Sequence, residues 1–158
     1  MRKFVLGLAL LAGAATAQVG PVQIDFGKVE EFADFGDSRW DRERNQKDFE
    51  AMLREATAAL PAGRQLSIKV LDVNLAGELE WWWSRADRLR VMRSVTWPMI
   101  EMEYALSEGG RTLKSGTVRL ADMNYLQNDF FSVSQSSTAM RYERRLLDRW
   151  FKEQILGK

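Results

Sequence analysis

The chain has 158 residues, with 23 lysines and arginines against 22 aspartates and glutamates, and it contains no histidine and no cysteine. The lack of histidine and cysteine excludes Ser-His-Asp and Cys-His catalysis, disulfide bonds and the usual zinc sites, because carboxylates alone suit harder ions. The charge balance gives no electrostatic basis for binding nucleic acid. The glycine patterns of phosphate-binding and dinucleotide-binding loops are also missing. We therefore expect neither a metal ion nor a cofactor.

Residues 1–17 have the three parts of a cleavable signal peptide. Two basic residues are followed by an uncharged, mostly apolar run over residues 4–14, and Ala15-Thr16-Ala17 has the small-x-small pattern of a cleavage site. That run is too short for a bilayer core of about 30 Å, and no later stretch is long and apolar enough to span one. Removal of residues 1–17 leaves residues 18–158, with 21 basic against 22 acidic residues and a net charge of −1. We expect one soluble domain in the periplasm or the medium.

The first half of this domain is predicted to form a strand, a helix and a second strand. Apolar residues alternate with polar ones over residues 22–26, which is typical of a strand with one buried face. Ser38 and Asp41 form a capping box for a helix. The apolar residues of that helix recur at helical spacing until Pro61 ends it. Alternation returns over residues 66–70 and predicts the second strand.

The second half adds two strands and a helix. Residues 72–88 are irregular, and the segment Asp72-Val-Asn74-Leu-Ala-Gly77 is interpreted as a turn that follows the second strand. A strand centred on residues 100–106 is joined by a Gly-Gly turn to one that includes residues 118–120, which predicts a hairpin. After a polar, serine-rich loop, the last helix has the apolar stripe Tyr142, Leu146, Leu147, Trp150 and Phe151. The predicted class is α+β in the order β-α-β-β-β-α, a mostly antiparallel sheet of about four strands with both helices on one face.

The best candidate for a binding surface is the run Trp81-Trp82-Trp83, followed by Arg85 and Arg88. Alternate residues of a strand face opposite sides, so three consecutive tryptophans cannot all enter the core. An exposed tryptophan stacks on sugar rings or anchors a partner protein, and nearby arginines pair with acidic groups. The alternative is ordinary packing over the edge of the core, because large aromatic residues are mostly buried.

Three further tryptophans are interpreted as structural. Trp97 lies just before a predicted strand, and Trp150 lies in the apolar stripe of the last helix. Trp40 is placed in the same class. Aromatic residues at such spacing belong to a core more often than to a ligand site.

Asp72, Glu78 and Glu80 could form a pair of carboxylates of the kind that glycosidases use. Acids near the end of a strand are more often solvated or cap turns, so a structural role is the alternative. The same segment resembles the start of a calcium loop, but Ala76 and Trp83 occupy the fifth and twelfth places, where that loop needs acidic or amide ligands.

The domain carries an ordered set of short motifs: Leu60-Pro-Ala-Gly63, Leu66-x-Ile68, Asp72-Val-Asn-Leu-Ala-Gly-Glu78, Arg90-Val-Met92, Trp97-Pro98, Leu120-x-Asp-Met-x-Tyr125, Tyr142-Glu143 and Trp150. Together they resemble the exported bacterial family catalogued as domain of unknown function 3016. The resemblance covers nearly all of residues 18–158, and Asn74 departs from the aspartate expected at its position, which weakens a metal-binding interpretation. It implies a bacterial periplasmic or secreted protein and brings no established activity or catalytic residue.

Missing histidine and cysteine chemistry beside an aromatic and basic segment favours a non-enzymatic accessory protein of the cell envelope that binds another protein. The first alternative is a glycan- or peptidoglycan-binding module that uses Trp81–Trp83. The second is a hydrolase that uses carboxylates.

We predict that the mature protein recovered from its host begins at Gln18, because signal peptidase cuts after small residues such as those at 15 and 17. Intact-mass spectrometry of the envelope fraction measures this directly. If most molecules there keep residues 1–17, the predicted cleavage is wrong.

Overall fold

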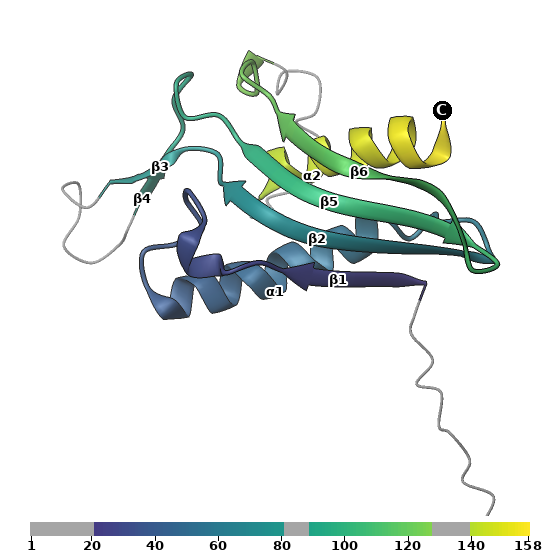
Figure 1. The fold of residues 1–158 in the computed structure, drawn as a ribbon. Helices are drawn as coiled ribbons and strands as arrows, with labels where there is room; N and C mark the ends of the chain where they lie inside the picture. Colours follow the sequence, from purple (N-terminus) through teal and green to yellow (C-terminus); the bar gives the residue numbers. More distant parts are fainter. Residues whose placement is uncertain (1–20, 81–88, 128–139) are drawn as a thin grey trace, which may run out of the picture.

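The computed structural model describes residues 21–80, 89–127 and 140–158, and a four-stranded sheet lies at its centre (Figure 1). The strand order is β1-β2-β5-β6, with β1 parallel to β2 and the other neighbours antiparallel. Helices α1 and α2 both lie behind the sheet in Figure 1. The predicted α+β class and the four-stranded, mostly antiparallel sheet with helices on one face are confirmed. The strands are β1 (Val22–Phe26), β2 (Arg64–Asn74), β5 (Met99–Glu108) and β6 (Arg111–Ala121).

Helix α1 begins where its sequence predicts, and both long helices pack through their predicted apolar stripes. Helix α1 (Arg39–Ala56) starts at the predicted capping box, in which the Asp41 amide donates to Ser38 Oγ at 3.1 Å and the carboxylate of Asp41 accepts from Ser38. Helix α2 (Arg141–Trp150) continues without a break into a π-helical segment, η3 (Phe151–Leu156). A 3-10 turn, η1 (Val29–Glu31), precedes α1. The stripes of both long helices join the sheet in one core: Phe49, Met52, Leu53, Leu146, Leu147, Trp150 and Phe151 are buried there.

The hairpin between β5 and β6 confirms the role of its two glycines. Gly109 and Gly110 have φ angles of +57° and +79°. Two consecutive positive φ angles characterise the tight hairpin turn whose twist matches that of the strands. The turn therefore fixes the register in which Glu108 faces Arg111.

The segment after residue 70 is more regular than its sequence indicates. Strand β2 continues to Asn74, so the turn predicted over residues 72–77 is wrong for its first half, and only residues 75–77 link β2 to the next strand. A bulge between Val70 and Asp72 inserts one residue, and Val70 and Val73 consequently both face the core. This shift interrupts the alternation by which a strand is recognised. A second, two-stranded sheet of β3 (Glu78–Glu80) and β4 (Leu89–Val91) follows and was not predicted.

The tryptophans divide into buried and exposed ones. Trp150 is 2% exposed and its ring meets that of Tyr104 edge-on at 5.4 Å between centroids, which confirms its structural role. Trp40 is 79% exposed and Trp97 is 36% exposed, so the prediction that both are structural is wrong. Trp40 lies nine residues before the buried Phe49, and at about 100° per residue this places it on the opposite side of α1.

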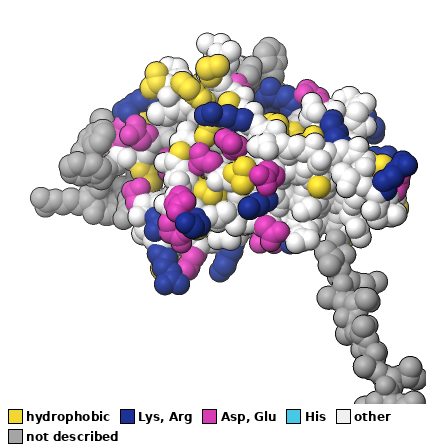
Figure 2. Space-filling view, viewed as in Figure 1, with side chains coloured by type: hydrophobic (Ala, Val, Ile, Leu, Met, Phe, Trp, Pro, Cys, Tyr) yellow, Lys and Arg dark blue, Asp and Glu magenta, His cyan; other side chains and the backbone are white. Residues whose placement is uncertain are grey.

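The face of the sheet that carries no helix is polar, and acidic and basic side chains are mixed on it (Figure 2). Across the strands, Lys69 is in register with Asp25 on one side and Glu103 on the other. An antiparallel sheet can keep one face in water in this way. Among residues 21–80, 89–127 and 140–158, no helix is long and apolar enough to cross a bilayer.

We predict that Trp150→Ala lowers the free energy of unfolding by about 3–5 kcal/mol, because the buried ring leaves a cavity. Trp40→Ala removes the same atoms from an exposed position and should change the free energy of unfolding by less than about 0.5 kcal/mol. Urea unfolding followed by circular dichroism measures both. Equal losses for the two variants would contradict the assignment of Trp150 to the core.

Candidate functional site

The β3–β4 hairpin stands outside the main sheet, and residues 75–77 link it to the end of β2. Gly77 links β2 to β3 with a φ of +77°, and a Cβ at this position would lie 2.8 Å from both the Val91 carbonyl oxygen and Met92 Sδ. The Gly77 amide donates to the Thr96 carbonyl at 2.9 Å. The backbone at the base of the hairpin is therefore packed too closely for any side chain at residue 77.

An ion pair between Arg90 of β4 and Asp34 fastens the hairpin to the loop that precedes α1. The two terminal guanidinium nitrogens, Nη1 and Nη2, donate to the Asp34 carboxylate at 2.8 and 3.1 Å, and Nη1 also donates to the Gly77 carbonyl at 2.9 Å. The Asp34 backbone is itself held by the end of β2, since its amide donates to Val73 and its carbonyl accepts from Leu75, both at 3.1 Å. One side chain of β4 thus connects three segments of the chain.

Glu143 of α2 holds the same region from the side of the core. It is 1% exposed, and its Oε1 accepts from the Ala76 amide at 2.6 Å. Burial raises the pKa of Glu143 above its ordinary value of 4.5, although the hydrogen bond from Ala76 and the positive charge of Arg90 oppose this shift. The carboxyl group is therefore a structural acceptor that positions the start of the hairpin.

Two further contacts fix the segment that follows β4. Tyr125 Oη donates to the Arg93 carbonyl at 2.8 Å, and the ring of Tyr125 packs edge-on against Tyr142 of α2 at 4.7 Å. The Arg93 guanidinium forms an ion pair with Glu80, whose side chain is fully buried. Contacts from α2, from β3 and from the loop after β6 thus hold the base of the hairpin.

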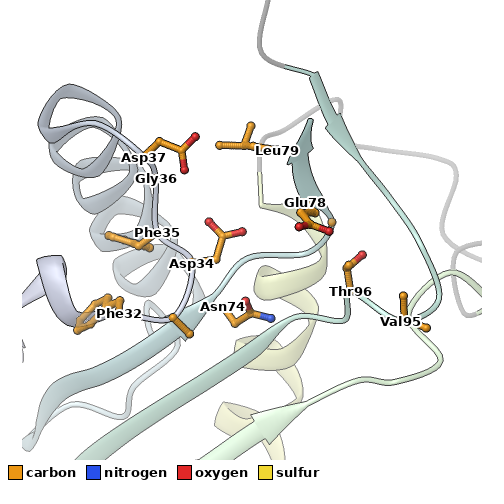
Figure 3. Close-up of a pocket in the computed structure, with 12 residues that line it drawn as sticks. Phe32, Asp34, Phe35, Gly36, Asp37, Asn74, Glu78, Leu79, Val95 and Thr96 are labelled. Atoms are coloured by element: carbon orange, nitrogen blue, oxygen red, sulfur yellow. The ribbon is translucent and has the colours of Figure 1, made fainter. Parts of the chain in front are cut away.

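A cleft of about 480 Å³ opens between the loop before α1 and strand β3 (Figure 3). Asp34 and Asp37 from the loop and Glu78 from β3 line it, together with the apolar side chains of Leu79 and Val95. Within the described residues its lining includes no lysine or arginine. Such a lining suits a group that donates hydrogen bonds or carries positive charge, flanked by apolar atoms.

Exposed apolar side chains gather at this end of the sheet, which we call the hairpin end. In Figure 2 they lie at the upper left, over the β4–β5 connection and the end of β6. The two segments adjoin each other, because the Asp122 amide donates to the Pro98 carbonyl at 3.4 Å. The apolar end patch, as we name it, comprises Met92, Val95, Trp97 and Met123, with exposures of 39, 71, 36 and 67%.

The predicted binding residues, Trp81–Trp83, Arg85 and Arg88, lie outside the described residues. They belong to the connection between β3, which ends at Glu80, and β4, which begins at Leu89. The sequence therefore places the tryptophan run immediately after the hairpin strand that borders the cleft.

Of the three carboxylates considered for hydrolysis, Glu78 and Glu80 share the partner Arg93, and Asp72 has a different one. Asp72 accepts a hydrogen bond from the Ala33 amide at 2.8 Å. Glu80 is buried against Arg93, whereas Glu78 is 62% exposed and 4.0 Å from the same arginine. In the part of the chain that the structure describes, no group of three or more acidic residues is placed to hold a metal ion.

Sequence reasoning missed Asp34, Arg90 and Glu143. Arg90 and Tyr142-Glu143 occur in the motifs quoted above, but a motif does not indicate which residues meet. Val95, by contrast, could have been found from the sequence. It is an apolar residue in a segment with neither helical nor strand periodicity, so no predicted core face accounts for it.

We predict that the contribution of Glu143 to the free energy of unfolding declines as the pH rises from about 4.5 through the folded-state pKa of Glu143. The folded-state pKa is raised, so folding binds the proton more tightly and stability is greatest below the unfolded value. Glu143→Gln keeps an acceptor for Ala76 without the charge and should flatten this decline. Glu55→Gln, an exposed carboxylate that pairs with Arg144, is the control and should leave it in place. Identical pH profiles for wild type and Glu143→Gln, measured by urea titration, would contradict the assignment.

Comparisons with known proteins place the whole fold in one family. The family model described as protein of unknown function (DUF3016) matches residues 20–153, which include every strand, the cleft and α2. No curated protein and no solved structure matches the chain. Because the match covers most of its length, this chain belongs to the DUF3016 family.

Proposed function

We propose that this protein is an exported, non-enzymatic accessory protein of the cell envelope that binds another protein through its hairpin end. The observation that carries the proposal is the apolar end patch beside the anchored base of β3–β4. Protein surfaces seldom gather large apolar side chains without a partner to cover them. Val95, Trp97 and Met123 are exposed together with Met92, whereas the face of the sheet without helices is polar.

The anchoring of the hairpin supports a recognition role. A two-stranded sheet with three residues in each strand is marginal by itself, and here Asp34, Glu143 and Tyr125 hold its base. Binding residues on a connection are effective when a rigid scaffold positions them. The connection between β3 and β4 carries Trp81–Trp83, and tryptophan is enriched among residues that dominate binding energy.

The cleft beside β3 adds acidic side chains to the proposed binding surface at the hairpin end. Glu78, whose side chain is 62% exposed, favours a basic or hydrogen-bond-donating group on the partner, whereas Asp34 is already bound by Arg90. Arg85 and Arg88, on the connection, favour acidic groups. We therefore propose a partner with both kinds of charge around an apolar centre.

The carboxylate hydrolase is the less supported alternative. Asp72 is hydrogen-bonded to Ala33, and Glu80 is buried and ion-paired with Arg93. Burial keeps Glu80 from a substrate in that arrangement, and Asp72 has a different partner from Glu80. Glycan binding by Trp81–Trp83 is the other alternative, and sedimentation with peptidoglycan separates it from protein binding.

We predict that Val95→Ser/Met123→Ser reduces partner capture by at least about tenfold, since anchors at an interface contribute about 2 kcal/mol or more. Both side chains are exposed, so the melting temperature should stay within a few degrees of wild type. The measurement is affinity capture from an envelope extract by residues 18–158, quantified by mass spectrometry.

Leu113→Ser is the matched control, because Leu113 is 38% exposed but lies next to the β5–β6 turn, away from the hairpin end. It should capture the same protein as wild type. Undiminished capture by the double variant would contradict the proposal. Sedimentation with purified peptidoglycan that is lost in Trp82→Ala, with no captured protein, would favour the glycan alternative instead.

A further inference from the structure

Strand β6 forms a long free edge of the sheet. It has 11 residues and, among the described strands, it pairs only with β5. A strand paired on one side leaves alternate amide and carbonyl groups pointing away from the sheet. The opposite edge, β1, has five residues, and its Val22 carbonyl accepts a hydrogen bond from Arg54 at 3.3 Å. The β6 edge is therefore the longer template for an additional strand.

The charges on β6 are all positive. Arg111, Lys114 and Arg119 are its charged residues, and the strand contains no acid. Lys114 Nζ donates to the carbonyl and Oε1 of Gln154, at 2.9 and 3.0 Å, and no salt bridge of these three basic residues occurs within the described part of the chain. Basic side chains on an edge oppose pairing with a second copy, which would bring like charges together. The same charges attract an acidic strand.

A groove lies on the helix side of this edge. Its volume is about 220 Å³, and its apolar lining comes from Val118 and Leu120 of β6 and from Leu146 and Trp150 of α2. In Figure 1 the C-terminal helix extends past the β6 edge behind the sheet. A strand added to β6 would lie over this helix, and its side chains on that face would point toward the groove.

We propose that β6 accepts an extended acidic segment of another protein as a fifth strand of the sheet. Backbone hydrogen bonds to the free edge supply affinity, and the side chains supply selectivity. Acidic residues on one face of the segment lie beside Arg119, and an apolar residue on the other face enters the groove. This site goes beyond the proposed function, because it uses a surface other than the hairpin end.

The test uses a fluorescein-labelled peptide of alternating glutamate and valine, titrated with residues 18–158 and followed by anisotropy. Arg111→Gln/Arg119→Gln should weaken binding about tenfold, since each exposed ion pair contributes modestly. The control Lys28→Gln/Lys47→Gln removes the same charge from exposed positions away from β6 and should bind as wild type. Hydrogen exchange with the peptide bound should protect amides within residues 111–121.

A second peptide, N-methylated along its backbone, keeps the charges but cannot form a ladder, and it should not bind. If it binds as well as the first, the attraction is only electrostatic and strand addition is overturned. Equal affinity of the Arg111/Arg119 variant, no binding of the first peptide at millimolar concentration, or self-association lost in that variant would also overturn the proposal. Val95→Ser/Met123→Ser should bind the peptide normally. Failure of the proposed strand addition at β6 is therefore distinguishable from failure of the proposed partner binding at the hairpin end.

Discussion

The ion pair between Arg90 and Asp34 determines where the hairpin end of this protein lies. Strands β3 and β4 make a ladder of three residue pairs, which is too short to be stable alone. Their position therefore depends on side chains, and Arg90 meets both oxygens of Asp34 and the Gly77 carbonyl. The Arg90 guanidinium is half-buried, so loss of Asp34 would leave its charge without a partner. Removing one member of a buried ion pair in this way destabilises a protein strongly.

The hairpin also depends on the core, because Glu143 belongs to the same helix as the buried residues beneath the sheet. Leu146, Leu147 and Trp150 place α2 against the sheet, and the position of α2 sets the point where Glu143 meets the Ala76 amide. The energetic cost of burying this carboxyl group is partly offset by the amide and by the nearby guanidinium. Stability of the core and placement of the hairpin are consequently coupled through one helix.

The surface divides into regions with different physical characters. The helix side of the sheet is buried, and the other face carries alternating charges such as Asp25, Lys69 and Glu103. The β6 edge is basic, and the hairpin end is apolar around an acidic cleft. Apolar exposure confined to one end is a local feature, since the same sheet carries polar side chains wherever it meets water on its open face.

The sequence alone determined the elements whose signals are local. Alternation over residues 22–26, the Ser38–Asp41 capping box and the Gly109-Gly110 turn each describe contacts between near neighbours, and all are present in the structure. The apolar stripe around Trp150 likewise records which side of one helix is buried. The α+β class follows from the order of these elements.

Only the tertiary structure decided the parallel pairing of β1 with β2, the bulge before Asp72 and the β3–β4 hairpin. The bulge moves Val73 onto the same face as Val70, which removes the period on which strand recognition depends. The candidate site escaped prediction for a related reason, because Asp34 and Arg90 are 56 residues apart and Ala76 and Glu143 are 67 apart. Contacts over such separations leave no periodic trace in a single sequence, since any charged residue in either segment satisfies the local pattern equally well.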